Sequence, residues 1–259
     1  VAKAAGMKYI VFTTKHHDGF SMFDTKYSDY KITSPESPYR KDIVAALAKA
    51  CHDAGIKLGF YYSQPDWHNP DFLSANHADY LKYMKNQLKE LCTNYGEVDV
   101  IWFDGILVFY TPQTGVDFYG AEQEKTWDTR EVFKMLRTLQ PGILINNRCG
   151  VPADFDTPEQ EIGRYQLNRP WESCITIGTQ WGYKKDDKVK STEECVQTLV
   201  RCAAGGGNLL LNVGPSPEGT FDPLQTDRLK EIGEWLNVNG ESVYGTRGGP
   251  VSPQSWGVT

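Results

Sequence analysis

The chain has 259 residues, of which 40% are hydrophobic and 12% aromatic, enough to bury a sizeable core and to argue against disorder. Its 33 acidic and 27 basic residues give a net charge of −6, and no basic run suggests a nucleic-acid partner. No apolar stretch approaches the ~20 residues that a membrane span requires. The six cysteines show neither a CxxC pair nor a zinc-binding spacing, so we expect mostly buried thiols without disulfide bonds.

Apolar runs rich in β-branched and aromatic residues alternate with segments of helical periodicity. The predicted strands, in chain order, are residues 7–14, 57–63, 98–105, 143–148, 172–177 and 208–214. The predicted helices are residues 41–54, 72–96, 126–139, 191–207 and 223–240, and residues 1–6 read as the end of a further helix that stops at Gly6. Strands that alternate with helices of this length indicate an α/β protein with a parallel sheet.

Polar and aromatic residues gather directly after five of the strands, in KHHDGF, YYSQPDW, FDG, NNR and NVGP. A (β/α) barrel carries its site in this way, at the C-terminal ends of its strands, whereas an open doubly wound sheet gathers polar groups at one crevice. The pattern therefore predicts a (β/α)8-type, TIM-like barrel. Six strands cannot close an eight-stranded barrel, so we expect one or two βα units upstream of Val1. The exposed edges of an incomplete barrel would favour homo-oligomers or a longer polypeptide.

Asp104 is the first candidate for chemistry, because it ends the apolar strand VDVIWFDG beside Trp102. A carboxylate there would lie at the rim of the barrel and be partly desolvated. An aspartate in this place can also cap a following helix. The aromatic neighbours favour a sugar site, since such pockets present aromatic faces to the C–H surface of the ligand.

A second carboxylate has to come from another strand end, because retaining glycoside hydrolysis needs two carboxyl groups about 5–5.5 Å apart. Three candidates follow the strand ILINNR: Glu159 and Glu161 in DFDTPEQE, and Glu172 in PWESC. Glu159 follows Pro158 in a loop and could reach over a substrate. Glu172 opens a strand and could instead be a packed structural carboxylate.

The adjacent pair His16 and His17 can hydrogen-bond sugar hydroxyls, and Asp18 can hold one ring in a single tautomer. A metal site is an alternative, with His68 and Asp104 as further ligands, and burial of one histidine for structural reasons is another. Arg148 would place a cation beside such a metal, which argues against it.

Other groups at the strand ends could line a sugar pocket. Arg148 has a planar fork that could bind a hydroxyl or orient a carboxylate, although a surface ion pair is an alternative. Trp181 and Tyr183 in QWGY are candidate walls. Tyr61 and Tyr62 point to opposite faces of their strand, so only one of them can line the site.

These residues, in this order, resemble the α-L-fucosidases of glycoside hydrolase family 29. The matching motifs are KYIVFTTKHHDGF, LGFYYS, VIWFDG, INNR, WESC with WGY, and GGNLLLNVGP, and they extend across nearly the whole chain. The resemblance implies a (β/α) barrel that hydrolyses α-L-fucosides with retention, without a metal or an organic cofactor. It implies that Asp104 is the nucleophile and that fucose is bound by His16, His17, Trp102, Arg148, Trp181 and a tyrosine at 61 or 62, which we take as Tyr61.

The acid/base follows less directly from the resemblance, since the TPEQE loop varies in the family. Counted from Arg148, Glu159 matches the family spacing better than Glu172 does, and we take Glu159, with Glu172 and Glu161 as alternatives. Residues 1–240 would form the catalytic barrel. Residues 241–259 would lead toward a C-terminal β-sandwich that this chain lacks.

The resulting hypothesis is a retaining exo-glycosidase that releases α-L-fucose from fucosylated oligosaccharides or glycoconjugates, with no nucleic-acid or membrane partner. The family suggests a secreted, periplasmic or lysosomal location, although the chain shows no signal peptide. One alternative is a fucose-binding barrel fragment without turnover. Another is a metal-dependent hydrolase of the barrel class.

Overall fold

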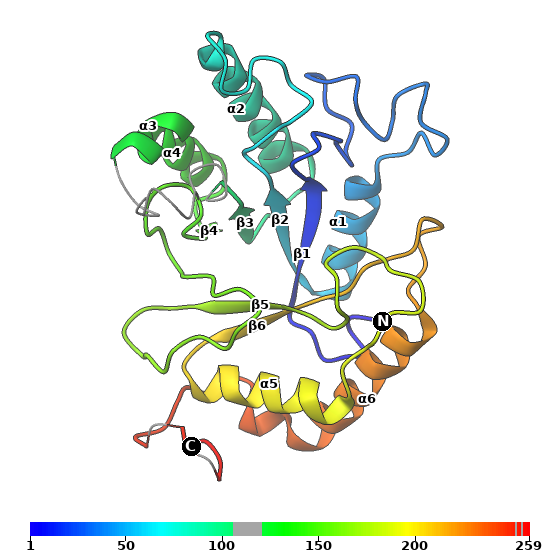
Figure 1. Ribbon diagram of the computed structural model, residues 1–259, viewed down its shortest axis with the longest axis vertical. Coiled ribbons are helices and arrows are strands. Elements are labelled where there is room, and N and C mark those ends of the chain that lie inside the picture. The colour runs from blue at the N-terminus through cyan, green and yellow to red at the C-terminus, as the bar shows by residue number, and fades with distance from the viewer. Residues whose placement is uncertain (106–120, 252, 255) are drawn as a thin grey trace. The chain divides into compact units, whose positions relative to one another are not determined.

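The computed structural model describes residues 1–105, 121–251, 253, 254 and 256–259, and its elements are labelled in Figure 1. The chain divides into two compact units. One, the four-stranded unit, comprises residues 9–154. The other, the two-stranded unit, comprises residues 1–8 and 155–259.

The four-stranded unit contains a parallel sheet whose strands follow chain order, β1-β2-β3-β4. Its strands are β1 (Tyr9–Lys15), β2 (Lys57–Tyr62), β3 (Val100–Phe103) and β4 (Leu144–Ile145). Its helices are α1 (Ile43–Ala54), α2 (His77–Asn94), α3 (Ala121–Trp127) and α4 (Thr129–Leu139). The prediction of an α/β protein with parallel strands is confirmed.

Helix α1 shows how closely the local signals determine an element. Its apolar positions Val44, Ala48 and Cys51 lie on one face and are buried. The Asp42 side chain caps the first turn by accepting from the Ala45 N–H at 2.8 Å. Gly55 ends the helix in the left-handed conformation, with φ of 68°, and its N–H returns to the last turn.

Two predicted helices differ from the structure where a residue adopts a positive φ. The helix expected over 72–96 begins only at His77, because Leu73 has φ of 50°. The helix expected over 126–139 is divided into α3 and α4 by Asp128, whose φ is 51°. A left-handed residue cannot continue an α-helix, and neither residue is a glycine that would have signalled the break.

The two-stranded unit pairs β5 (Glu172–Thr176) with β6 (Asn208–Asn212) in parallel. It also contains α5 (Thr192–Ala204), α6 (Pro223–Asn239) and the 3₁₀ turn η2 (Gly240–Ser242). Residues 1–7 have the hydrogen bonds of a helix C-terminus, because the N–H of Ala5 donates to the Val1 carbonyl, that of Gly6 to Lys3 and that of Met7 to Ala2. Gly6 has φ of 77°, so the prediction of a helix end that stops at Gly6 is confirmed. In the described part of the chain all six cysteines are buried thiols, which confirms that prediction.

The predicted barrel is not seen as a closed structure in the described residues: β1–β4 form one sheet, and β5 and β6 form another. The predicted α/β class is confirmed.

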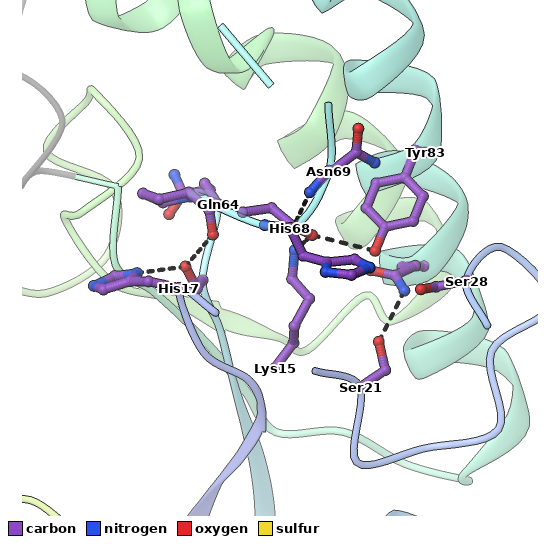
Figure 2. Close-up of polar contacts among 12 residues, drawn as sticks. Lys15, His17, Ser21, Ser28, Gln64, His68, Asn69 and Tyr83 are labelled. Carbon is purple, nitrogen blue, oxygen red and sulfur yellow. Dashed lines mark hydrogen bonds and ion pairs between the residues drawn. The ribbon is translucent and has the colours of Figure 1, made fainter. Parts of the chain in front are cut away.

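A buried ion pair attaches the loop that follows β2 to the end of β1. Lys15 is fully buried, and its Nζ lies 2.8 Å from Asp66 Oδ2. Asp66 Oδ1 accepts from the backbone N–H groups of His68 and Asn69 at 3.1 and 3.0 Å, and Tyr83 donates to Oδ2 at 3.2 Å (Figure 2). Burial lowers the pKa of Lys15, and the charge of Asp66 acts in the opposite direction.

Removing one partner of this pair should cost far more than removing both. Lys15→Met leaves a buried carboxylate without its cation and should lower the free energy of unfolding by about 3–5 kcal/mol. Lys15→Met combined with Asp66→Asn removes both charges and should be more stable than Lys15→Met alone. Urea denaturation of both single variants and the double variant measures the coupling. Losses that simply add would show that the two charges do not stabilise each other.

Candidate active site

The parallel register brings the carboxyl ends of β1, β2 and β3 to one edge of the sheet. Thr13 is paired with Tyr61, and Tyr61 is paired with Trp102. The residues that follow each strand therefore meet at this edge, as they do at the carboxyl ends of parallel strands in general. They include His16 and His17 after β1 and Asp104 after β3, and Arg148 lies three residues after the neighbouring strand β4.

Asp104 is the centre of the site and is only 7% exposed. Arg148 donates from Nη1 to Oδ1 at 2.9 Å, and the Tyr61 hydroxyl donates to Oδ2 at 2.8 Å. His17 Nε2 lies 3.5 Å from Oδ2. Both carboxylate oxygens therefore have a hydrogen-bond donor, and the two donors fix the orientation of the carboxylate.

His17 is buried, and its ring is held by the loop that follows β2 rather than by the adjacent residue Asp18. Its Nδ1 lies 2.6 Å from Ser63 Oγ, and Ser63 Oγ donates to the Pro65 carbonyl at 2.5 Å (Figure 2). A hydroxyl has one proton, so Ser63 must accept from His17 Nδ1–H. Nε2 of the neutral ring then presents a lone pair to the site. The structure gives Ser63 the role that the sequence suggested for Asp18.

The pKa of His17 is lowered by burial, and the charge of Asp104 opposes this effect. The neutral ring is therefore favoured near neutral pH. A neutral Nε2 can accept a hydrogen bond from a hydroxyl group of a ligand.

His16, Tyr61, Trp102 and Arg148 form a row of stacked groups along the sheet edge. His16 lies parallel to Tyr61 with ring centroids 5.3 Å apart, and Tyr61 lies parallel to Trp102 at 5.7 Å. The Arg148 guanidinium lies 4.5 Å from the centre of the Trp102 ring. His16 is also oriented by its Nδ1, which accepts from the His17 N–H at 2.8 Å. Of the two tyrosines, Tyr61 faces the site, whereas the Tyr62 hydroxyl donates to Gln87 on α2.

Two buried amides that the sequence analysis did not single out hold the end of β3. Asn146 accepts from the Phe103 N–H at 2.8 Å and donates to its carbonyl at 2.9 Å. Gln64 accepts from the Asp104 N–H at 2.9 Å. Both residues lie in polar strand-end motifs, NNR and YYSQPDW, which is the one sequence signal that could have pointed to them.

Ligand atoms of His16, His17 and Asp104 lie within 4.8 Å of one another, so the expected metal alternative has a geometric basis in the described residues. His68 is not among them. Imidazole and carboxylate groups suit a zinc-like ion. However, Arg148 is already paired with Asp104 Oδ1, and an ion there would face a second fixed positive charge. We therefore interpret the polar groups around Asp104 as hydrogen-bond partners of its carboxylate rather than as a metal site.

The candidates for the second carboxylate lie in the two-stranded unit, together with Trp181. Glu159 and Glu161 are exposed, whereas Glu172 is 4% exposed at the start of β5. The backbone around Glu159 is fixed to β5, because Cys174 N–H donates to the Pro158 carbonyl at 3.0 Å and Gln160 N–H donates to the Cys174 carbonyl at 2.9 Å. Trp181 is 42% exposed.

Comparison with known proteins identifies the family. The family profile described as Alpha-L-fucosidase matches residues 1–241, and the chain belongs to this family, glycoside hydrolase family 29. It is 31% identical over 266 residues to the α-L-fucosidase of Dictyostelium discoideum and 31% identical over 281 residues to the human plasma α-L-fucosidase. These matches cover 95% and 99% of the chain, but only 54% and 57% of the relatives.

Solved structures agree with this assignment. α-L-Fucosidase isoenzyme 1 from Paenibacillus thiaminolyticus superposes with a TM-score of 0.88 at 41% identity, over 99% of this chain and 66% of that one. A fucosidase from Bacteroides thetaiotaomicron, trapped as a covalent intermediate with 2-fluoro-fucosyl fluoride, superposes with a TM-score of 0.86 at 32% identity. This match covers 99% of the present chain and 63% of the Bacteroides chain. The chain thus spans between half and two thirds of the length of these relatives. Within the described residues, no helix combines the length and the hydropathy that crossing a membrane requires.

The lowered pKa of His17 predicts a loss of stability in acid. Below the ordinary value of 6.5 the unfolded chain takes up a proton that the folded chain resists. The stability of the wild type should therefore fall, relative to His17→Gln, by at most about 1.4 kcal/mol per pH unit as the pH decreases from about 7 to about 5. Denaturation of both proteins across this range measures the difference. A relative gain in acid would mean that the folded state prefers a protonated His17 paired with Asp104.

Proposed function

We propose that this chain carries the catalytic site of a retaining α-L-fucosidase, with Asp104 as its nucleophile. The observation that supports this most directly is the buried Asp104 carboxylate, which is held by Arg148 and Tyr61 at the carboxyl edge of a parallel sheet. Membership of the fucosidase family agrees with it. The related fucosidase from Bacteroides thetaiotaomicron was trapped as a covalent intermediate, and a retaining glycosidase forms such an intermediate.

In the first step, an Asp104 oxygen would form a bond to the anomeric carbon of fucose while the glycosidic C–O bond breaks. The acid/base would give its proton to the departing oxygen. In the second step, water would attack the same carbon, the acid/base would take a proton from that water, and the bond to Asp104 would break. The hydrogen bonds from Arg148 and Tyr61 would hold the carboxylate in a fixed orientation between turnovers.

Glu159 is our proposed acid/base. Its side chain is exposed and could therefore reach a leaving group. The backbone hydrogen bonds of its two neighbours to Cys174 on β5 restrain the position of its Cα. Glu172 is buried at the start of β5 and is better suited to a structural role. Glu161 is the remaining alternative, exposed like Glu159 but two residues further along the loop.

The fucose ring would be bound by hydrogen bonds and by an aromatic surface. His17 Nε2 is an acceptor, the Arg148 fork is a donor, and the rings of Tyr61 and Trp102 can face C–H groups. His16 and Trp181 complete the proposed set of fucose-binding residues. No metal or organic cofactor has a part in this mechanism.

We further propose that residues 1–240 belong to a TIM-like (β/α) barrel domain and that residues 241–259 lead out of it toward a β-sandwich. The sequential parallel order of β1 to β4 suits an arc of such a barrel. The substrate would be a fucosylated oligosaccharide or glycoconjugate. A secreted or lysosomal-type location is our proposal, supported by the names of the plasma and tissue α-L-fucosidases of humans.

Two other functions can be separated from this one by experiment. A fucose-binding protein without turnover would bind fucose but would not hydrolyse an aryl α-L-fucoside. A metal-dependent hydrolase built on His16, His17 and Asp104 would lose its activity after exhaustive chelation, whereas the proposed enzyme should keep it.

Removal of the nucleophile should abolish turnover for every leaving group, because no covalent intermediate can form. Asp104→Gly should therefore be almost inactive, and azide placed in the vacated space should give a fucosyl azide of inverted configuration. Product analysis by NMR, with an aryl fucoside as substrate, checks both points. An Asp104→Gly variant with the kcat and KM of the wild type would refute the assignment of the nucleophile.

The loss of rate caused by removing the acid/base should depend on the leaving group of the substrate. Glu159→Ala should hydrolyse an activated aryl fucoside much better than a fucosylated disaccharide, because a good leaving group needs little protonation. Azide should accelerate its second step and give a fucosyl azide of retained configuration. Glu172→Ala is the matched control and should lose stability or binding instead. The retained azide product from Glu172→Ala, with near-normal kinetics for Glu159→Ala, would reverse the assignment.

A further inference from the structure

Gln64 lies two residues beyond the end of β2 (Figure 2). It is completely buried. Its side-chain Oε1 accepts from the Asp104 N–H at 2.9 Å, and its Nε2 donates to the Arg148 carbonyl at 3.2 Å. Its own carbonyl accepts from the Tyr80 hydroxyl. One amide group therefore connects the backbones of both members of the Asp104–Arg148 ion pair.

The orientation of this amide is determined by its two partners. The Asp104 N–H can only donate and the Arg148 carbonyl can only accept, so the oxygen and nitrogen of Gln64 cannot exchange places. Gly105 makes room for the amide, because a Cβ at Gly105 would lie 2.5 Å from Gln64 Nε2. The Gly105 N–H also donates to the Arg148 carbonyl, at 3.0 Å.

The contact matters because Asp104 lies beyond the regular sheet. Strand β3 ends at Phe103, so the ladder of backbone hydrogen bonds does not extend to Asp104. The Gln64 side chain supplies the hydrogen bond that a neighbouring strand would otherwise give. Without it, the Asp104 backbone would have an unsatisfied buried N–H and one fewer restraint.

We propose that Gln64 is a positioning residue, whose amide fixes the Asp104 nucleophile relative to Arg148. This inference rests on the proposed function of the site. A nucleophile has to approach the anomeric carbon along a narrow range of directions, and a displacement of about 1 Å can cost about 100-fold in rate. Gln64 would therefore affect kcat more than KM, since the geometry matters most in the transition state.

The test uses two variants of Gln64 and one matched control. Gln64→Met fills a similar volume but removes both hydrogen bonds. Gln64→Glu should restore them in acid, because burial at this position favours the protonated carboxyl group. That group has a carbonyl that can accept from the Asp104 N–H and an O–H that can donate to the Arg148 carbonyl. Gln87→Met is the control: Gln87 is an equally buried amide that contacts Tyr62, Ser21 and Thr25, away from Asp104.

At pH about 5, and with rates corrected for the folded fraction, Gln64→Met should lose roughly 10- to 100-fold in kcat with little change in KM. Gln64→Glu should be clearly faster than Gln64→Met at the same pH. Gln87→Met should lose stability but keep kcat within about threefold of the wild type. A Gln64→Met enzyme with wild-type kcat would overturn the proposal, as would a Gln64→Glu enzyme no faster than Gln64→Met.

A second measurement does not depend on turnover and separates this inference from the proposed function. Hydrogen exchange of the Asp104 amide should be slow in the wild type and in Gln87→Met, and faster in Gln64→Met. An inactive wild-type chain would refute the fucosidase proposal while leaving this measurement valid. Unchanged protection of the Asp104 amide in Gln64→Met would refute the positioning role.

Discussion

The buried ion pair between Asp104 and Arg148 is the interaction on which the rest of the site depends. Both groups are at least nine-tenths buried, and a buried charge is tolerated only when it is paired and hydrogen-bonded. The residues around the pair satisfy that requirement. Tyr61 donates to the second carboxylate oxygen, and Gln64 joins the two backbones. The carboxylate that we propose as the nucleophile is therefore held at both of its oxygens.

The spacing of the sheet explains why these groups fit together. Neighbouring strands lie about 4.8 Å apart, so flat side chains at equivalent strand ends are separated by about the distance at which rings stack. His16 follows β1, Tyr61 and Trp102 lie one residue before the ends of β2 and β3, and Arg148 lies three residues after β4. The successive separations of these groups are 5.3, 5.7 and 4.5 Å. The sequential order of the strands thus produces a row of stacked flat groups beside Asp104.

Hydrogen bonds from the loop after β2 complete the arrangement. Ser63 selects the tautomer of His17, Gln64 holds Asp104, and Asp66 forms the buried pair with Lys15. Different polar groups along one short segment therefore reach residues at the ends of other strands. This explains how a loop, which is otherwise a mobile type of element, can support a site that needs fixed geometry.

The sequence by itself determined the strands and most of the helices, and it predicted Asp104, His17 and Arg148 as candidate site residues, because periodicity and strand-end position are local properties. It also carried the motifs of the fucosidase family. Only the tertiary structure decided that Tyr61 rather than Tyr62 faces Asp104, and that Ser63 rather than Asp18 orients His17. The hydrogen bonds of Gln64 and Asn146 join residues 40 and 43 positions apart, and they exist only in one register of the strands. The helix breaks at Leu73 and Asp128 have the same origin, since a positive φ in these residues is imposed by their surroundings and not by their own preference.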